Sequence, residues 1–553
     1  MLATQTNVPI EFPLTAQKEH DDIFNALEVN VLFTGPGGIQ WKVPAFWAGE
    51  NVFRVRFAPP KVGRYTYTST CTDEADTGLH GQQGELVARP YAGANLLYQH
   101  GRLRVGPSRR TLEHTDGTPF FWLGDTWWMG LCKRLSWPAD FRILTADRVA
   151  KGFSVVQIIA GLYPDMPAFD ERGANEAGFP WDEGYGRINP AYFDLADRRI
   201  AHLVESGLLP CLVGCWGYFL PWMGAAKMKR HWRNLVARWG SYPVVWCLAG
   251  EATMPYYLSK DREADGRLQK RGWTELAAYV RAVDPFRRPL TVHPSTSARL
   301  SVDDPAVLDF DMLQTGHGDR GSLPNTVRLV SESFRAEPPM PVVEGEVDYE
   351  GIGGFCGPDV QRLVFWACIL NGAAGFTYGA NGLWQVNTRA RPYGPSPHGM
   401  SWGDTPWEEA CRLPGSAQLG LARRFLAGYR WWEFRPHPEW ADPPWTDELS
   451  GLPFSWDRHN VPMAAGIPGQ VHVIYCPVGG RLKRVRGLDP GKAYRIRLYN
   501  PVSGAEEERG EIRPDAEGNW NFALPGLPAW FPFPVYQDWV LALEAPGTRV
   551  TLA

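Results

Sequence analysis

Two glutamates that each follow a short apolar run are the residues best suited to chemistry. Glu251 comes just after Val244–Leu248 and Glu346 just after Pro341–Val343. Cleavage of a glycosidic bond needs one protonated carboxyl to donate to the leaving oxygen and one ionised carboxylate to attack the anomeric carbon or activate water. Apolar neighbours would raise the pKa of Glu251, whereas polar neighbours suit an ionised Glu346. The pair therefore predicts glycosidic-bond chemistry, with Glu251 as the acid.

A third glutamate competes for the second role. Glu344 lies two residues before Glu346, and residues i and i+2 of a strand share a face, so both can point inward. Each member of the predicted pair also has a structural alternative. Glu346 can be a carboxylate paired with an arginine, and Glu251 can be a solvated loop residue.

Polar and aromatic side chains follow the other apolar runs. Sugars present an apolar C–H face and a rim of hydroxyls, which suit aromatic rings flanked by polar groups. The candidates for substrate contact are Asp125, Trp127, Trp128, Gln157, Trp216, His293, Gln314, His317, Tyr349, Tyr378 and Trp384. Asp125 can instead cap the first helix, a histidine can be a satisfied core residue, and any of the rings can belong to the core. The acidic loop at residues 165–183 is expected to shape a pocket or an oligomer contact.

Strand-like apolar runs that alternate with amphipathic helical stretches must position these residues. The eight runs are Phe120–Leu123, Phe153–Ala160, Leu208–Cys215, Val244–Leu248, Pro289–Val292, Phe310–Leu313, Pro341–Val343 and Gly375–Tyr378. Helices are expected at Ala191–Ser206, Ala226–Trp239, Trp273–Val283, Thr326–Phe334 and Val360–Leu370. Eight such units predict an α/β fold, a (β/α)8 TIM barrel, whose active site lies at the carboxyl ends of its strands.

The two ends of the chain have a different pattern of short alternating runs with Gly and Pro between them. Such runs predict a β-sandwich on each side of the barrel. The predicted domains are an N-terminal sandwich at residues 1–98, the barrel at 99–429 and a C-terminal sandwich at 430–553.

Composition and missing motifs exclude several other classes. A net charge of −4 with no basic stripe argues against nucleic-acid and membrane-surface partners. We find no GxSxG elbow, phosphate-binding loop, strand-linked GxGxxG or zinc-type histidine spacing, so we predict no cofactor and no metal. The nine scattered cysteines are expected to be buried hydrophobes. The N-terminus lacks a signal-peptide pattern, so a cytoplasmic location is expected, and a homo-oligomer is left open.

At this point the chain resembles a known group, the apiosidase-like barrel hydrolases. The resemblance rests on GDTWW at residues 124–128, the carboxylate that closes the fourth run, and Gly345-Glu346 followed by Tyr349-Glu350. The N-terminal stretches FTGPGG, WKVPAFW and FRVRFAPPKVGRYTYT resemble the sandwich that often precedes these barrels. The resemblance implies Glu251 as acid/base, Glu346 as nucleophile, retention of the anomeric configuration and a link to furanose sugars.

Two departures from the group's pattern point to a different substrate. Members commonly carry Gly-Gly-Asp where this chain has Ala249-Gly250-Glu251. Many members of the wider clan also have an Asn just before the acid, to bond a sugar hydroxyl, and that place is Gly250 here. Asp125 and Gln157 are the candidates to replace it.

Three functions follow from these observations. The first is a retaining, exo-acting glycosidase for oligosaccharides or small glycosides. The second is a non-catalytic carbohydrate-binding protein on a degenerate barrel, and the third is a metal-dependent barrel hydrolase.

Overall fold

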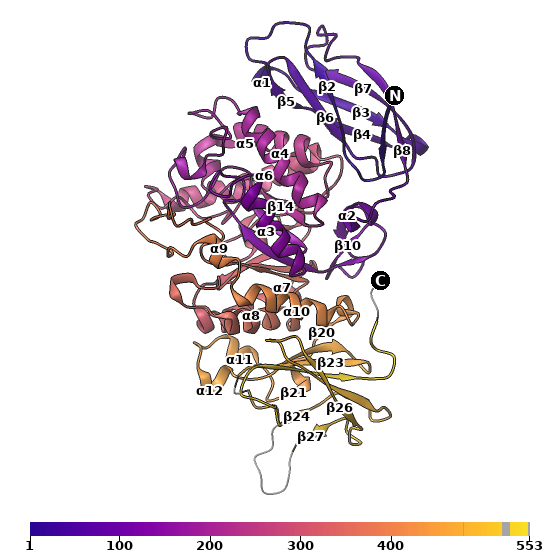
Figure 1. The fold of residues 1–553 in the computed structure, drawn as a ribbon, viewed down its shortest axis with the longest axis vertical. Helices are drawn as coiled ribbons and strands as arrows, with labels where there is room; N and C mark the ends of the chain where they lie inside the picture. The colour runs from indigo at the N-terminus through magenta and orange to yellow at the C-terminus, as the bar shows by residue number, and fades with distance from the viewer. Residues whose placement is uncertain (479, 523–530, 551–553) are drawn as a thin grey trace.

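The computed structural model describes residues 1–478, 480–522 and 531–550. Three parts follow one another along the long axis of the molecule (Figure 1). An eight-stranded parallel barrel occupies the middle, and groups of largely antiparallel strands lie at the two ends. No helix among the described residues is long and apolar enough to cross a lipid bilayer.

The barrel strands are short and almost entirely buried, which is typical of parallel strands covered by helices. They are β12 (Trp122–Trp127), β13 (Val155–Ile159), β14 (Leu209–Val213), β15 (Val245–Cys247), β16 (Leu290–Thr291), β17 (Asp311–Gly316), β18 (Val342–Val347) and β19 (Gly375–Tyr378). The sheet runs in the order β16-β15-β14-β13-β12-β19-β18-β17. A backbone hydrogen bond of 2.8 Å from Asp309 N–H to the Leu290 carbonyl joins its two ends. The predicted (β/α)8 barrel is therefore confirmed.

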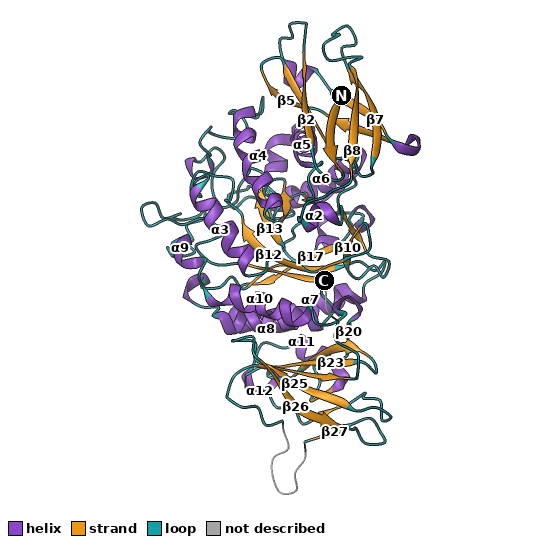
Figure 2. Ribbon diagram, turned by 45° about the vertical axis from the view of Figure 1, so that its right-hand side comes forward, coloured by secondary structure: helices purple, strands orange, loops and turns teal. Residues whose placement is uncertain are grey.

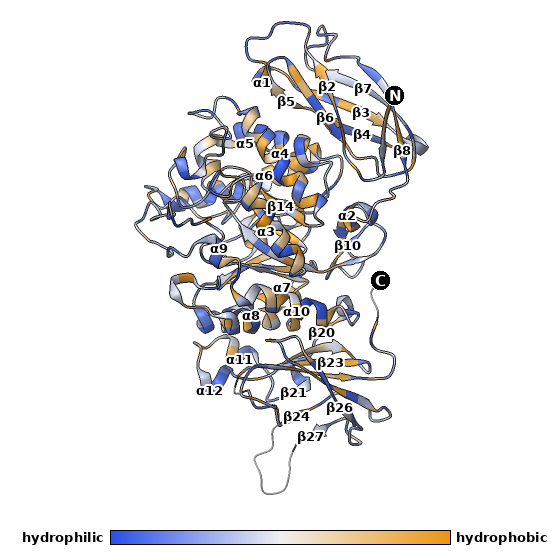
Figure 3. Cartoon of the chain, in the orientation of Figure 1, coloured by the Kyte–Doolittle hydropathy of each residue, from blue (hydrophilic) through white to orange (hydrophobic). Residues whose placement is uncertain are grey.

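Helices surround the barrel (Figure 2), and each carries both hydrophobic and hydrophilic residues (Figure 3). They are α3 (Ala139–Ala150), α4 (Pro190–Glu205), α5 (Phe219–Trp239), α6 (Arg262–Val283), α7 (Leu323–Arg335), α8 (Pro358–Leu370), α9 (Trp407–Ala410) and α10 (Pro414–Leu426). The start of α4 shows why the sequence begins a helix there: Pro190 is the first helical residue, and the Asn189 side chain accepts hydrogen bonds from the next two backbone N–H groups. The five helices expected from the sequence are all present. The bounds of α4, α7 and α8 lie within three residues of those expected, and α5 and α6 begin earlier than expected.

The N-terminal region contains two sheets packed face to face. The strands are β1 (Leu2–Gln5), β2 (Ile10–Thr15), β3 (Val29–Thr34), β4 (Gln40–Pro44), β5 (Phe46–Gly49), β6 (Val52–Phe57), β7 (Gly63–Cys71) and β8 (Gln83–Arg89), with the short helix α1 (Ile23–Ala26). One sheet has the order β1-β8-β7-β3-β4 and the other β2-β6-β5. Phe33 of the first sheet stacks on Phe57 of the second, with ring centroids 4.0 Å apart.

A small sheet connects this region to the barrel and corrects one prediction. It consists of β9 (Leu103–Val105), β10 (Leu112–His114) and β11 (Pro119–Phe120), after the short helix α2 (Leu96–Gln99). Phe120 pairs with Leu112 in β10, so the first barrel strand begins at Trp122 rather than at Phe120.

The C-terminal region repeats the pattern of a larger and a smaller sheet. Its elements are β20 (Arg435–Pro436), β21 (Ala441–Asp442), α11 (Asp447–Ser450), α12 (Trp456–His459), β22 (Met463–Ile467), β23 (Val471–Cys476), β24 (Arg484–Val485), β25 (Tyr494–Tyr499), β26 (Glu506–Ile512), β27 (Trp520–Asn521) and β28 (Trp539–Glu544). The buried ion pair of Arg362 in α8 with Asp538, at 2.7 Å, fixes this region to the barrel. The domain boundaries at residues 98 and 429 stay predictions.

Candidate active site

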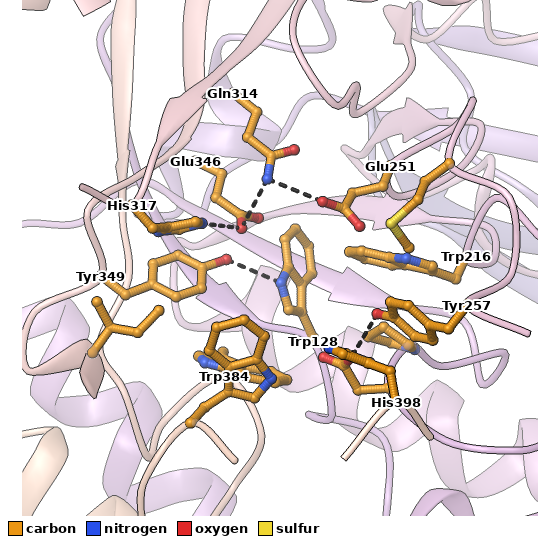
Figure 4. A pocket seen from close by; sticks show the side chains of 15 residues that line it. Trp128, Trp216, Glu251, Tyr257, Gln314, His317, Glu346, Tyr349, Trp384 and His398 are labelled. Atoms are coloured by element: carbon orange, nitrogen blue, oxygen red, sulfur yellow. Dashed lines mark hydrogen bonds and ion pairs between the residues drawn. The ribbon is translucent and has the colours of Figure 1, made fainter. Parts of the chain in front are cut away.

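Gln314 brings the two predicted catalytic glutamates together at the carboxyl end of the barrel. Its amide nitrogen lies 3.1 Å from Glu251 Oε1 and 3.4 Å from Glu346 Oε1 (Figure 4). Glu251 follows β15, Gln314 lies in β17 and Glu346 lies in β18. The barrel closes these strand ends onto one another, and one NH2 group can donate to two acceptors.

Two histidines surround the Glu346 carboxylate. His317 Nε2 lies 2.8 Å from Oε1 and His293 Nε2 lies 3.2 Å from Oε2. Burial opposes ionisation of Glu346, but the two histidines outweigh it and hold the pKa of that carboxyl well below its usual range. Burial also opposes charge on His317, yet Glu346 raises the pKa of His317 above its ordinary value. Glu346 is thus held as an ionised carboxylate.

His293 links the backbone of one glutamate to the side chain of the other. The Glu251 backbone N–H donates to His293 Nδ1 at 3.4 Å. Nδ1 accepts this hydrogen bond, and Nε2 is the ring nitrogen that faces Glu346. His293 is completely buried and lies behind the pocket wall, so its contacts are with the two glutamates and with the Trp128 and Trp216 rings.

Glu251 has the opposite protonation behaviour. Burial is the largest cause that raises its pKa to about 7, and the charge of Glu346 adds to it. Its backbone φ is +38°, an uncommon conformation for a residue with a side chain. Hydrogen bonds hold the chain on both sides, from Gly250 N–H to the Cys215 carbonyl and from Ala252 N–H to the His293 carbonyl. Strained backbone held in this way is common at functional sites.

Glu344 does not reach the pocket. Register shifts between β17 and β18 surround this segment, so Glu344 and Glu346 do not share a face as an ideal strand would require. The Glu344 carboxyl is completely buried and accepts a hydrogen bond from Glu346 N–H, and Cys368 of α8 lies beside it. Burial raises the pKa of Glu344 well above its ordinary value, so it is a protonated interior group.

Aromatic rings enclose the two glutamates in a small pocket. The cavity has a volume of about 210 Å³. The aromatic lining residues are Trp128, Trp216, Tyr257, Tyr349, Trp384 and Trp402. Trp128 Nε1 donates to the Tyr349 hydroxyl at 3.1 Å, which fixes two of these rings (Figure 4). Of the sequence-predicted contacts, the structure places Trp128, Trp216, Gln314, His317, Tyr349 and Trp384 at this pocket.

Besides His293, four predicted contact residues lie inside the barrel wall: Asp125, Trp127, Gln157 and Tyr378. Asp125 is completely buried and forms an ion pair of 2.5 Å with Arg148 of α3, and it also accepts from Trp127 Nε1 at 2.7 Å. The Tyr378 hydroxyl donates to Glu350 at 2.6 Å. The last of the four, Gln157, donates to the Gly345 carbonyl at 2.8 Å. The structure places none of these four side chains at the pocket, because each is engaged by an interior partner.

Gly250 leaves room for an aromatic ring. A Cβ atom at this position would overlap the ring of Trp216, so a side chain there and the observed Trp216 position exclude each other. The place where many clan members have Asn is therefore filled by an indole. Neither Asp125 nor Gln157 supplies the missing polar group in the pocket.

A third carboxylate does line the pocket, and only its loop was predicted from the sequence. Asp165 lies in the acidic loop after β13 and accepts a 2.5 Å hydrogen bond from the Tyr257 hydroxyl. His398 packs on the Tyr257 ring, with centroids 4.3 Å apart. Burial raises the pKa of Asp165 above its ordinary value. Tyr257 and His398 carry no strand-end signal, since they lie in loops far along the chain from Asp165.

The sequence predicts that the nine cysteines are buried hydrophobic residues. All nine cysteines are buried, as expected. Within the described ranges, no group of three or more His, Cys, Asp or Glu side chains is placed to hold a metal ion.

The barrel and its paired carboxylates place the chain among the barrel glycoside hydrolases. The family model described as apiosidase-like, catalytic domain, matches residues 107–433, and a domain of unknown function, DUF5060, matches residues 5–72. The chain belongs to the apiosidase-like family. A search of curated proteins found no match.

Solved structures agree with this fold. A putative glycoside hydrolase from Bacteroides vulgatus ATCC 8482 covers 99% of this chain and 100% of its own, with 17% identity and a TM-score of 0.70. A glycoside hydrolase family 5 protein from the same organism covers 82% of this chain and 95% of its own, with 21% identity and a TM-score of 0.65. At these identities the likeness concerns the fold.

Proposed function

We propose that this protein is a retaining exo-glycosidase that removes one sugar unit from an oligosaccharide or small glycoside. The observation that carries the proposal is the shared donor: one Gln314 amide contacts both Glu251 and Glu346 inside an aromatic pocket. The two carboxyl groups have opposed pKa shifts, as an acid and a nucleophile of one reaction need.

In the proposed mechanism, protonated Glu251 donates to the leaving oxygen while Glu346 attacks the anomeric carbon. The bond to the leaving group breaks as the glycosyl–Glu346 ester forms. Glu251, now ionised, then removes a proton from water, and that water releases the sugar from Glu346. His293 and His317 keep Glu346 ionised before the attack.

Retention is supported by the geometry of the shared donor. The two N–H bonds of an amide diverge by about 120°, so acceptor oxygens at the observed distances lie roughly 5–6 Å apart. Retaining pairs are ~5–5.5 Å apart, whereas inverting pairs are ~6.5–9.5 Å apart to admit a water.

Exo action is supported by the size and walls of the pocket. A volume of about 210 Å³ corresponds to roughly seven water molecules, which suits a single sugar unit. Asp165 can accept from its hydroxyls in place of the Asn that Gly250 replaces. The family description makes apiose-like pentofuranosides the first substrates to test.

The test is a panel of aryl glycosides, furanose and pyranose in both anomers, with the first-formed product read by proton NMR. We expect hydrolysis of one glycone class with retention of configuration. First-formed sugar of the opposite anomer would overturn the two-step mechanism. If no panel member is cleaved while Glu251→Gln and the parent bind the same glycan equally well, the protein is a carbohydrate-binding protein instead.

A further inference from the structure

A second cavity, of about 490 Å³, lies between the N-terminal sheets and the barrel. Trp41 of β4 lines it on one side, and Phe286 and Arg288 line it on the other, in the segment that leads into β16. Because this segment precedes the strand, the cavity is at the amino-terminal end of the barrel. The pocket with Glu251 and Glu346 is at the opposite end.

The walls of this cavity carry an excess of positive charge. Lys61, Arg102, Arg287 and Arg288 all line it, and no Asp or Glu does so among the described residues. Arg102 and Arg287 are joined by a 2.8 Å hydrogen bond from the Arg102 guanidinium to the Arg287 carbonyl. Burial lowers the pKa of Arg102, the Asp284 charge opposes this, and the nearby Arg287 charge lowers the pKa further. The fold therefore holds Arg102 and Arg287 next to each other.

Arg288 differs from the other buried arginines. Six arginines are buried in the described part of the chain. The five others have carboxylate partners: Arg56 with Asp197, Arg148 with Asp125, Arg199 with Glu176, Arg238 with Asp197 and Arg362 with Asp538.

Among the described residues, the guanidinium of Arg288 donates to two backbone carbonyls, those of Gly240 at 2.9 Å and Ser241 at 3.2 Å. Asp284 lies nearby and accepts a 2.8 Å hydrogen bond from the Arg288 backbone N–H. Burial lowers the pKa of Arg288 to about 10, although the charge of Asp284 acts to raise it, so Arg288 is still charged at neutral pH. A buried guanidinium that contacts no carboxylate directly is compensated only in part by Asp284, and an anion in the cavity would offset the remaining cost.

We propose that this cavity binds the phosphate group of a small molecule. Guanidinium groups match phosphate oxygens with paired N–H donors, and three arginines line this cavity. Trp41 and Phe286 add ring surface on which the uncharged part of a phosphate ester can pack. Inorganic phosphate and a sugar phosphate share this chemistry and are the two sources to distinguish. The proposal is independent of the glycosidase function.

The experiment is calorimetric titration of the full chain with inorganic phosphate, glucose 1-phosphate and glucose at constant ionic strength. We expect saturable binding of at least one phosphate compound and none of glucose. Binding of both phosphate compounds with equal affinity indicates free phosphate as the ligand, and tighter binding of the ester indicates a phosphorylated metabolite. No saturable binding of either compound overturns the proposal.

Two variants locate the site. Arg287→Gln changes an exposed cation at the cavity, and Arg102→Gln provides a second position. Each is expected to weaken phosphate binding by about tenfold. The matched control is Arg104→Gln, an exposed arginine two residues from Arg102 that pairs with Glu113 and does not line the cavity. Unchanged affinity in both cavity variants, or an equal loss in the control, would overturn the assignment. Circular dichroism checks that each variant is folded.

Discussion

Buried carboxylates on the two sides of the barrel mouth have different kinds of partner. On the side of β12, Asp125 is paired with the buried guanidinium of Arg148, at 2.5 Å. On the side of β15 and β18, the carboxyl groups of Glu251 and Glu346 share the neutral Gln314 amide, and two histidines contact Glu346. Among the described residues that line the pocket there is no lysine or arginine. Without a permanent cation beside them, burial and the charge of Glu346 raise the pKa of Glu251.

The contrast shows which carboxyl groups at the ends of the barrel strands are suited to proton transfer. The Asp125 carboxylate is a structural element, because Arg148, Trp127 and the Thr126 backbone N–H occupy its oxygens. Glu251 and Glu346 are costly to bury, and His317 balances their negative charge only partly. We expect the following substitutions to separate the two sides, in order of decreasing effect.

The largest effect is expected from Glu346→Ala. Loss of the nucleophile should lower kcat/KM on aryl glycosides by about 10⁴-fold or more. Added azide should restore turnover and give a glycosyl azide of inverted configuration, since it attacks from the vacant side. The matched control is Glu344→Gln, which imitates the protonated Glu344 carboxyl and should stay within about tenfold of the parent. A larger loss in the control than in Glu346→Ala would assign the nucleophile to Glu344.

A smaller loss is expected from Glu251→Gln. General acid catalysis contributes about 10²–10⁴-fold, and the loss should depend on the leaving group. Dinitrophenyl glycosides, which need no protonation, should be nearly unaffected in their first step, whereas alkyl glycosides should lose the full factor. The values of kcat/KM on the two substrates, which report the first step, measure this. Equal losses on both would contradict the acid role of Glu251.

On the opposite side, Asp125→Asn should act on stability. Arg148 would keep the partly exposed Asp147 as a partner but would lose its buried one, and breaking a buried pair costs about 3–5 kcal/mol. We expect chemical denaturation to show this loss, while kcat/KM of the folded enzyme changes by less than about threefold. Asp147→Asn is the control, since the partly exposed Asp147 contacts the same Arg148 and should cost under about 1 kcal/mol. A 100-fold fall in activity with unchanged stability would place Asp125 in the site.

The same contrast explains how far the sequence could predict the site. The eight strands could be predicted because each is a short, buried apolar run. Glu251 and Glu346 could be predicted as site residues because they lie at strand ends. The ion pair of Asp125 with Arg148 could not be predicted, because Arg148 lies in the helix that follows β12 and no sequence pattern places the two side chains together. Such pairing depends on how α3 packs against the barrel.

The limits at Glu344 and Asp165 have different physical origins. An ideal strand would put Glu344 and Glu346 on one face, and the register shifts along β17 and β18 that separate them leave no clear sequence signal. Asp165 has a φ of +56° in a long loop, where neither periodicity nor propensity fixes the direction of a side chain. Its partner Tyr257 comes from another loop, so only the folded barrel brings them together.

The smallest expected effect tests what sets the acid's proton affinity. Activity of the parent should fall as pH rises through about 7, because Glu251 must be protonated to act as the acid and its pKa is about 7. The acid limb should lie below the usual glutamate range, because the pKa of Glu346 is lowered. In Glu346→Gln the charge next to Glu251 disappears, but burial, the larger cause, stays. The pKa of Glu251, followed by carbon-13 NMR, should therefore fall by less than about one unit. A fall to the ordinary value would show that repulsion between the two carboxylates, rather than desolvation on this side of the mouth, keeps the acid protonated.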